Sequence, residues 1–203
     1  MTERDREAGA QRRAVALAGH EGDEPTARAG LASADTGVRA TALGALERMG
    51  ALRVEDLQAG LVDPDGSVQR RACEAIALLP GDQPPSLRAA LASVDATVVE
   101  VAAWASGERE PPEAQIVEVL ALLTVDHDDA LVREAAVAAL GAIGDDAGLP
   151  AILTATKDKA TVRRRAVLAL APFEGKAVDA ALREARQDRD WQVRQAAEDL
   201  SEQ

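Results

Sequence analysis

Few side chains in this chain have the types and spacing that metal or nucleophilic chemistry requires. Its two histidines are His20, which precedes Glu21, and His127, which precedes Asp128. One His–Glu pair supplies too few ligands for a metal centre, and the single cysteine, Cys73, cannot build a thiolate zinc site. The sequence also has no glycine-rich phosphate-binding loop. We therefore predict no metal site, no cofactor and no catalytic residue.

Arginines occur in three short clusters, Arg12–Arg13, Arg70–Arg71 and Arg163–Arg165. Such clusters could bind an acidic partner or a phosphate through charge-assisted hydrogen bonds. They could also line the solvated edge of a helix, and their spacing favours this second interpretation. The choice between the two depends on the helices that carry the arginines.

A repeated motif indicates what those helices are. Asp-x-x-Val-Arg, followed by an alanine-rich apolar segment, recurs six times with some variation, and its valines are separated by 30, 30, 34, 30 and 31 residues. A period in this range marks a solenoid, in which each unit buries its apolar face against its neighbours. The residue four positions after the valine is always alanine, so the two share one face of a helix. The six valines are Val38, Val68, Val98, Val132, Val162 and Val193.

Each motif also carries signals for helix ends. The residue three before the valine is aspartate in five units, where it can cap a helix N-terminus, and Lys159 in the fifth unit. Another helix precedes each motif, with prolines such as Pro25 and Pro150 near its start. Glycines between units, such as Gly107 and Gly144, can end the second helix. Each unit therefore has the pattern helix, short turn, helix.

The chain resembles HEAT repeats, in particular the short form of about thirty residues named after bilin lyases, over about residues 8 to 200. The matching segments are Asp35–Arg39, Asp63–Val68, Asp129–Arg133 and Asp190–Arg194. The resemblance implies that aspartates and arginines of the turns form a ladder joining successive repeats. Gln69 and Val99 replace the arginine in two units, so we expect an interrupted ladder there. The arginines that would form the ladder are Arg39, Arg133, Arg163 and Arg194.

Three enzyme families with related helical repeats are alternatives. A HEAT-type hydroxylase family holds two irons with several His–Glu pairs, whereas this chain has one. A family that removes alkylated bases from DNA needs a basic face and several aromatic side chains, whereas this chain has only Trp104, Trp191 and Phe173. A bilin lyase would need a cleft for its chromophore. We favour a protein that is not an enzyme over all three.

We predict one HEAT-like domain over residues 1–203. Its fold class is all-α, an α–α superhelix of about six helix-pair repeats plus an N-terminal half-repeat. Five positions past the valine, the last unit carries Glu198 where the others carry apolar residues, which indicates a capping repeat and a complete small solenoid. Cys73 occupies this packing position, so we expect a buried structural thiol. The half-repeat covers residues 8–22, and the repeats cover residues 23–50, 51–81, 82–108, 109–145, 146–173 and 174–203.

Composition limits the partners and the location. The chain has 35 acidic and 23 basic residues, and its formal net charge is −12. This charge argues against general nucleic-acid binding, which needs excess positive charge to displace counterions. The sequence has neither a signal-peptide core nor a membrane-spanning apolar run, so we expect a cytoplasmic protein without a membrane partner. The sequence does not specify an oligomeric state.

Trp104 is the residue whose position most suggests a binding site. It lies six positions past its valine, an offset that points away from the buried stripe. By the family resemblance, the second helices line the concave surface, where Trp104 would lie above small residues and among charges of both signs. Such a tryptophan is typical of a protein-binding hot spot, and the alternative is that it fills space in the core. The predicted partner-binding residues are Trp104, Arg70, Glu100, Glu134, Arg164 and Leu168.

We therefore predict a scaffold or adaptor, not an enzyme, that binds a protein or peptide segment in its concave groove. The alternative function is a lyase-like or regulatory HEAT-repeat module that acts on a small molecule or a modified partner. A partner recovered in a pull-down would favour the first prediction. A bound small molecule detected by native mass spectrometry would favour the second.

Overall fold

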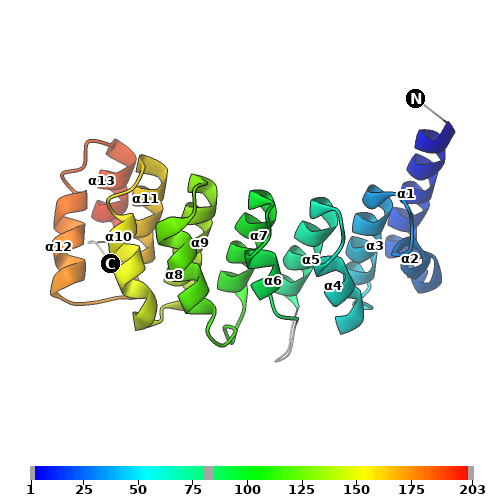
Figure 1. Ribbon diagram of the computed structural model, residues 1–203, viewed down its shortest axis with the longest axis horizontal. Coiled ribbons are helices and arrows are strands. Elements are labelled where there is room, and N and C mark those ends of the chain that lie inside the picture. The colour runs from blue at the N-terminus through cyan, green and yellow to red at the C-terminus, as the bar shows by residue number, and fades with distance from the viewer. Residues whose placement is uncertain (1–2, 80–84, 201–203) are drawn as a thin grey trace. The chain divides into compact units, whose positions relative to one another are not determined.

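The computed structural model describes residues 3–79 and 85–200, and within these ranges its regular elements are all helices (Figure 1). The all-α prediction is therefore confirmed. The chain divides into two compact units, Met1–Val98 and Val99–Gln203. Apart from the N-terminal helix, the chain is built from helix pairs, and the second helix of each pair carries the motif valine.

The first unit begins with a long helix and continues with helix pairs. Helix α1 packs against both α2 and α3, and α3 in turn packs against α5. Helix α7 begins in this unit and crosses the boundary at Val98. The helices are α1 (Glu3–Glu21), α2 (Glu24–Gly30), α3 (Thr36–Arg48), α4 (Val54–Leu61), α5 (Gly66–Leu78), α6 (Arg88–Leu91) and α7 (Ala96–Glu108).

The second unit contains three further helix pairs. The second helices α9, α11 and α13 pack on one another in order. The fourth repeat, whose valine follows the previous one by 34 residues, has a longer first helix than the fifth. Helix α8 has 11 residues, whereas α10 has 7. The elements are α8 (Ile116–Asp126), α9 (Ala130–Ile143), the short 3₁₀ helix η1 (Asp146–Gly148), α10 (Leu149–Ala155), α11 (Ala160–Ala169), α12 (Lys176–Ala185) and α13 (Trp191–Asp199).

Burial confirms the predicted register of the second helices. Each of the six motif valines is at most 2% exposed, and the alanine four positions later is 0% exposed in every repeat. Burying these small apolar side chains removes them from water, which is the main favourable term in folding. The small alanine side chain four residues after the valine lets the neighbouring helices approach closely.

The predicted N-terminal caps are also present. The carboxylates of Asp35, Asp65, Asp129 and Asp190 each accept a backbone N–H from the first turn of a second helix, at 2.9 Å. Each bond satisfies a donor that has no partner inside its helix. Lys159 is the N-cap residue before α11 and makes no side-chain cap, because its side chain has no acceptor.

Small residues near the ends of the second helices bring neighbouring helices together. A Cβ on Gly107 would lie 2.8 Å from the Cα of Ala139, and one on Gly141 would lie 2.6 Å from the Cα of Ala169. The prediction that Gly107 ends a helix is wrong, because this residue lies inside α7 and is needed for close packing. Gly144 does end α9, with a φ of 68° that glycine adopts without strain.

Candidate functional site

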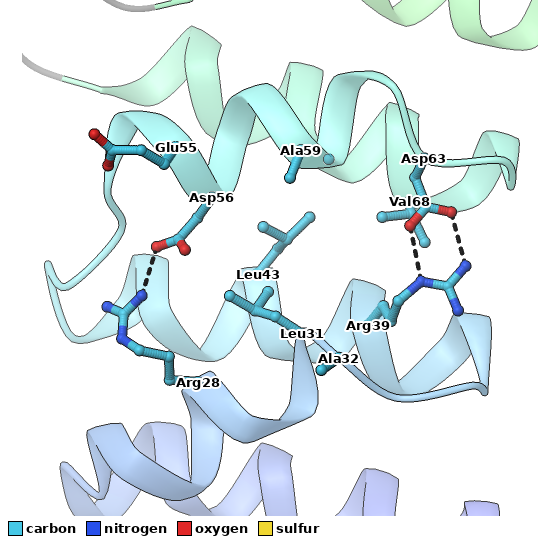
Figure 2. A pocket seen from close by; sticks show the side chains of 11 residues that line it. Arg28, Leu31, Ala32, Arg39, Leu43, Glu55, Asp56, Ala59, Asp63 and Val68 are labelled. Atoms are coloured by element: carbon cyan, nitrogen blue, oxygen red, sulfur yellow. Dashed lines mark hydrogen bonds and ion pairs between the residues drawn. The ribbon is translucent and has the colours of Figure 1, made fainter.

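The ladder expected from the resemblance forms at three of its arginines. In the first unit, Nε and Nη2 of Arg39 bond both carboxylate oxygens of Asp63 at 2.8 and 2.7 Å (Figure 2). In the second unit, Arg133 binds Asp158 at 2.6 and 2.8 Å, and Arg163 binds Asp188 at 2.8 and 2.7 Å. The aspartates that cap the helices are thus a different set from those that pair with the ladder arginines.

These pairs have a structural role. The Arg163 guanidinium holds the pKa of Asp188 below its ordinary value, although burial of the carboxylate acts in the opposite direction. The third nitrogen of Arg163, Nη1, donates to the backbone carbonyl of Asp158 at 2.8 Å, so each nitrogen of this guanidinium makes a hydrogen bond. Charges neutralised in this way are not available to attract a ligand.

The ladder is interrupted where the sequence predicts it. Gln69 donates from Nε2 to the carbonyl of Asp63 at 2.6 Å, within its own turn, and Val99 is buried. Arg194 keeps the bond within its own turn, from Nη1 to the carbonyl of Asp188 at 2.7 Å. Within residues 3–79 and 85–200, no carboxylate accepts a hydrogen bond from the Nε or Nη2 of Arg194.

A hollow of about 280 Å³ lies on the first-helix side of the first unit, lined by α2, α4 and their neighbours. Figure 2 shows Leu31 and Leu43 between two ion pairs, Arg28–Asp56 at 2.8 Å and Arg39–Asp63. The four charges at its ends neutralise one another. The hollow therefore offers apolar walls but no unpaired guanidinium at either end to orient a charged ligand.

The predicted partner-binding residues of the second unit lie on three second helices. Trp104 and Glu100 are on α7, Glu134 is on α9, and Arg164 and Leu168 are on α11. Trp104 is 41% exposed. Glu134 lies 3.6 Å from Arg165, so its charge is partly compensated.

The structure brings two of these residues together with Trp191. Arg164, Leu168 and Trp191 line a hollow of about 110 Å³. Trp191 is 65% exposed, and it is not among the residues that the sequence predicts to bind a partner. Its signal was available in the sequence, because the corresponding positions of the other units carry glycine, alanine or threonine. The remaining lining residues are Gln192, Gln195, Ala196 and Asp199.

Arg70, the sixth predicted residue, lies on α5 in the first unit. Its Nη1 donates to the Oγ1 of Thr97 at 2.5 Å and lies 3.7 Å from the carboxylate of Asp95. The adjacent Arg71 pairs with Glu47 and Glu74. These contacts agree with the interpretation that this arginine cluster lines a helix edge.

The histidines and the cysteine do not form a site together. His20 is exposed in the first unit, whereas His127 lies in the second, where its Nδ1 accepts the backbone N–H of Asp129 at 3.1 Å. No group of three metal-ligating side chains is found among the residues that the structure describes. Cys73 is fully buried, and this burial raises the pKa of its thiol to about 12.

Nor does any helix in the described ranges combine the length and the apolar character that crossing a membrane requires.

Comparison with known proteins places the chain in a structural class. Residues 116–201 match the family model of HEAT repeats. The solved structure of YibA from Escherichia coli is 19% identical, with a TM-score of 0.66 over 97% of this chain and 73% of that one. A designed armadillo repeat protein is 17% identical, with a TM-score of 0.58 over 88% of this chain and 98% of that one. A search of curated proteins gives no significant match.

These similarities confirm the predicted resemblance to HEAT repeats and the solenoid fold. The fold is that of HEAT-like and armadillo-like repeat proteins, which is typical of protein-binding scaffolds. An enzyme is also among the similar structures, since human deoxyhypusine hydroxylase is 20% identical with a TM-score of 0.50, over 95% of this chain and 78% of that one. At this identity the similarity describes the fold alone.

Proposed function

We propose that this protein is an interaction scaffold, not an enzyme, that binds a segment of a partner protein on the second helices of the unit Val99–Gln203. We call this surface the second-helix face and define it by Trp104, Glu100, Glu134, Arg164, Leu168 and Trp191. These helices are the elements that the sequence predicts to line a concave groove. Arg70 belongs to the other unit, and its part in binding stays a sequence prediction.

The observation that carries the proposal is the exposure of both tryptophans. Aromatic residues make up 1% of the chain, yet Trp104 and Trp191 are 41% and 65% exposed on second helices of the repeat. The core is built mainly from alanine, leucine, valine and isoleucine, and neither tryptophan is among its buried residues. Tryptophan and arginine are the side chains most enriched where a few residues dominate binding.

The alternative function, acting on a small molecule, requires a cleft of suitable size. Sites for such ligands usually enclose about 300–1,000 Å³. The hollow between the two ion pairs of the first unit has about 280 Å³, and the one at Trp191 has about 110 Å³. Both are smaller than that range, but two other hollows, of about 440 Å³ beside His20 and Arg71 and of about 470 Å³ beside Arg183 and Glu184, lie within it. Cleft size therefore does not separate the two functions, and the exposed tryptophans are what favour the scaffold.

The test compares partner capture by the intact chain and by matched variants. We expect Trp104→Ala to weaken a partner recovered from the native host by about 2 kcal/mol or more. The control is Leu122→Ala, since Leu122 is 65% exposed on α8, outside the second-helix face. That variant should leave partner binding unchanged.

Two results would count against the proposal. One is unchanged partner binding by Trp104→Ala. The other is a loss of about 3–5 kcal/mol in the free energy of unfolding, the cost of truncating a core tryptophan, which thermal melts would detect. A bound small molecule found by native mass spectrometry of protein from its own host would favour the alternative function.

A further inference from the structure

Two arginines without a carboxylate partner flank Trp191. Arg164 lines the same hollow as Trp191, and Arg194 follows Trp191 by three residues, one turn along α13. Within the described parts of the chain, neither arginine forms an ion pair. The arginines on either side of Arg164 do form ion pairs, Arg163 with Asp188 and Arg165 with Glu134.

The ladder shows what the free donors of Arg194 can bind. Arg39, Arg133 and Arg163 each hold a carboxylate with Nε and Nη2 while Nη1 binds a carbonyl of their own turn. Arg194 makes the corresponding carbonyl bond to Asp188, which fixes one side of its guanidinium. Its Nε and Nη2 are then left as a pair of donors that suits a carboxylate.

The hollow itself fits one side chain. A volume of about 110 Å³ equals roughly three to four water molecules in the liquid, at about 30 Å³ each. Leu168, Ala196 and the ring of Trp191 give it apolar walls. The acidic group that lines it, Asp199, already accepts a hydrogen bond of 2.8 Å from Gln195.

We infer that this hollow and the two arginines form a subsite for a peptide segment in which an acidic residue stands on each side of a bulky apolar one. The apolar side chain enters the hollow beside Trp191, and the side-chain carboxylates bind Arg164 and Arg194. This inference rests on the proposed function and names the partner's chemistry at one end of the second-helix face. The net charge of −12 works against non-specific attraction of an acidic segment, so binding depends on these two arginines.

The experiment uses the full chain carrying Trp104→Phe, so that Trp191 is the only tryptophan. Its fluorescence is followed during titration with acetyl-Ala-Glu-Leu-Glu-Ala-amide and with the matched peptide that has glutamine at both glutamate positions. We expect the glutamate peptide to bind about a hundredfold more tightly, since the glutamine peptide loses two charged interactions and each contributes about a factor of ten or more. Circular dichroism melts check that each variant is folded.

Substitutions then test whether Arg164 and Arg194 are the residues that bind the glutamate peptide. Arg164→Gln and Arg194→Gln should each reduce binding of the glutamate peptide about tenfold. The matched control is Arg48→Gln, which removes the charge of an exposed arginine in the first unit. Binding by that variant should change less than about twofold, the size expected for a change in net charge alone.

Three results would overturn the inference: equal binding of the glutamine peptide, tighter binding of a lysine peptide, or tighter binding of a peptide whose only carboxylate is its C-terminus. If the glutamate peptide does not bind while partner capture still depends on Trp104, the inference about the subsite is wrong and the proposed function stands. If no partner depends on Trp104 but the glutamate peptide binds through Arg164, the subsite stands and the wider surface is wrong.

Discussion

The ion pair between Arg163 and Asp188 offers a quantitative test of how the repeats are held together. The side chains of Arg163 and Asp188 are 9% and 15% exposed, so the pair is largely removed from water. The variant Arg163→Met keeps an apolar stem of similar length but removes both bonds to Asp188. It also removes the bond to the carbonyl of Asp158.

The expected loss in the free energy of unfolding depends on the contacts that Asp188 keeps in the variant. Removing one partner of a buried ion pair costs about 3–5 kcal/mol, because the other charge stays buried without compensation. Asp188 still accepts the backbone N–H of Asp190 at 2.8 Å and keeps some contact with water. We therefore expect the lower end of that range, about 3 kcal/mol, which for a chain of this length lowers Tm by about 6–12 °C.

The effect should also depend on pH in a defined direction. Arg163 lowers the pKa of Asp188 in the folded protein relative to its unfolded value of about 3.9. The stability gained from this pair is therefore fully present above about pH 4 and is lost as the pH falls through the lowered pKa. The difference in unfolding free energy between wild type and Arg163→Met should narrow at about pH 3, below the unfolded pKa.

Urea unfolding followed by far-UV circular dichroism at pH 7 and at about pH 3 measures both quantities. The control is Arg183→Met, because Arg183 is exposed on α12 and its Nε donates only to a backbone carbonyl of its own helix. That variant should change the unfolding free energy by less than about 0.5 kcal/mol. Equal losses for the two variants, or a loss for Arg163→Met that does not narrow in acid, would refute the reasoning.

Three further outcomes can be measured on the same protein. Gly141→Ala should lower the free energy of unfolding by about 2 kcal/mol, since the overlap with Ala169 outweighs the roughly 1 kcal/mol gain in helix propensity, whereas Gly9→Ala should raise it by about 0.5–1 kcal/mol. Ala136→Leu should lower it by about 1–3 kcal/mol through overpacking, and an unchanged melt would contradict the register of the repeat. The thiol of Cys73 should resist a thiol reagent at neutral pH until the chain is unfolded, because burial keeps it protonated; rapid labelling of the native protein would contradict this.

Much of the fold could be predicted because the repeat places the same chemistry at fixed offsets. The valine and the alanine four residues later share a helix face, and the aspartate three residues before the valine caps the helix. The aspartates that accept the ladder hydrogen bonds are harder to identify from the sequence. Asp63 and Asp188 stand five residues before the motif valine that follows them, whereas Asp158 stands four residues before its motif valine. A carboxylate at a variable offset in a turn is recognised only when its arginine is seen to reach it.

Other features depended on contacts that the sequence does not specify. Gly107 could serve either a helix end or a close approach of two helices, since both use the missing Cβ. The position of Trp191 is small in the other repeats, and at Gly66 a Cβ would overlap the carboxylate of Asp95 in the next turn. No turn within the described ranges packs on Trp191 in this way, so a large ring fits there and stays exposed.

The three consecutive arginines of α11 show why a run of charge in a sequence does not by itself define a binding patch. Successive residues of a helix point about 100° apart, so the three side chains leave the helix in three directions. Arg163 reaches Asp188, and Arg165 turns towards Glu134. Arg164 alone shares a hollow with Leu168, four residues later, and with Trp191. The capacity to bind a carboxylate therefore depends on which guanidinium the fold leaves unpaired, and in this cluster that is the middle one.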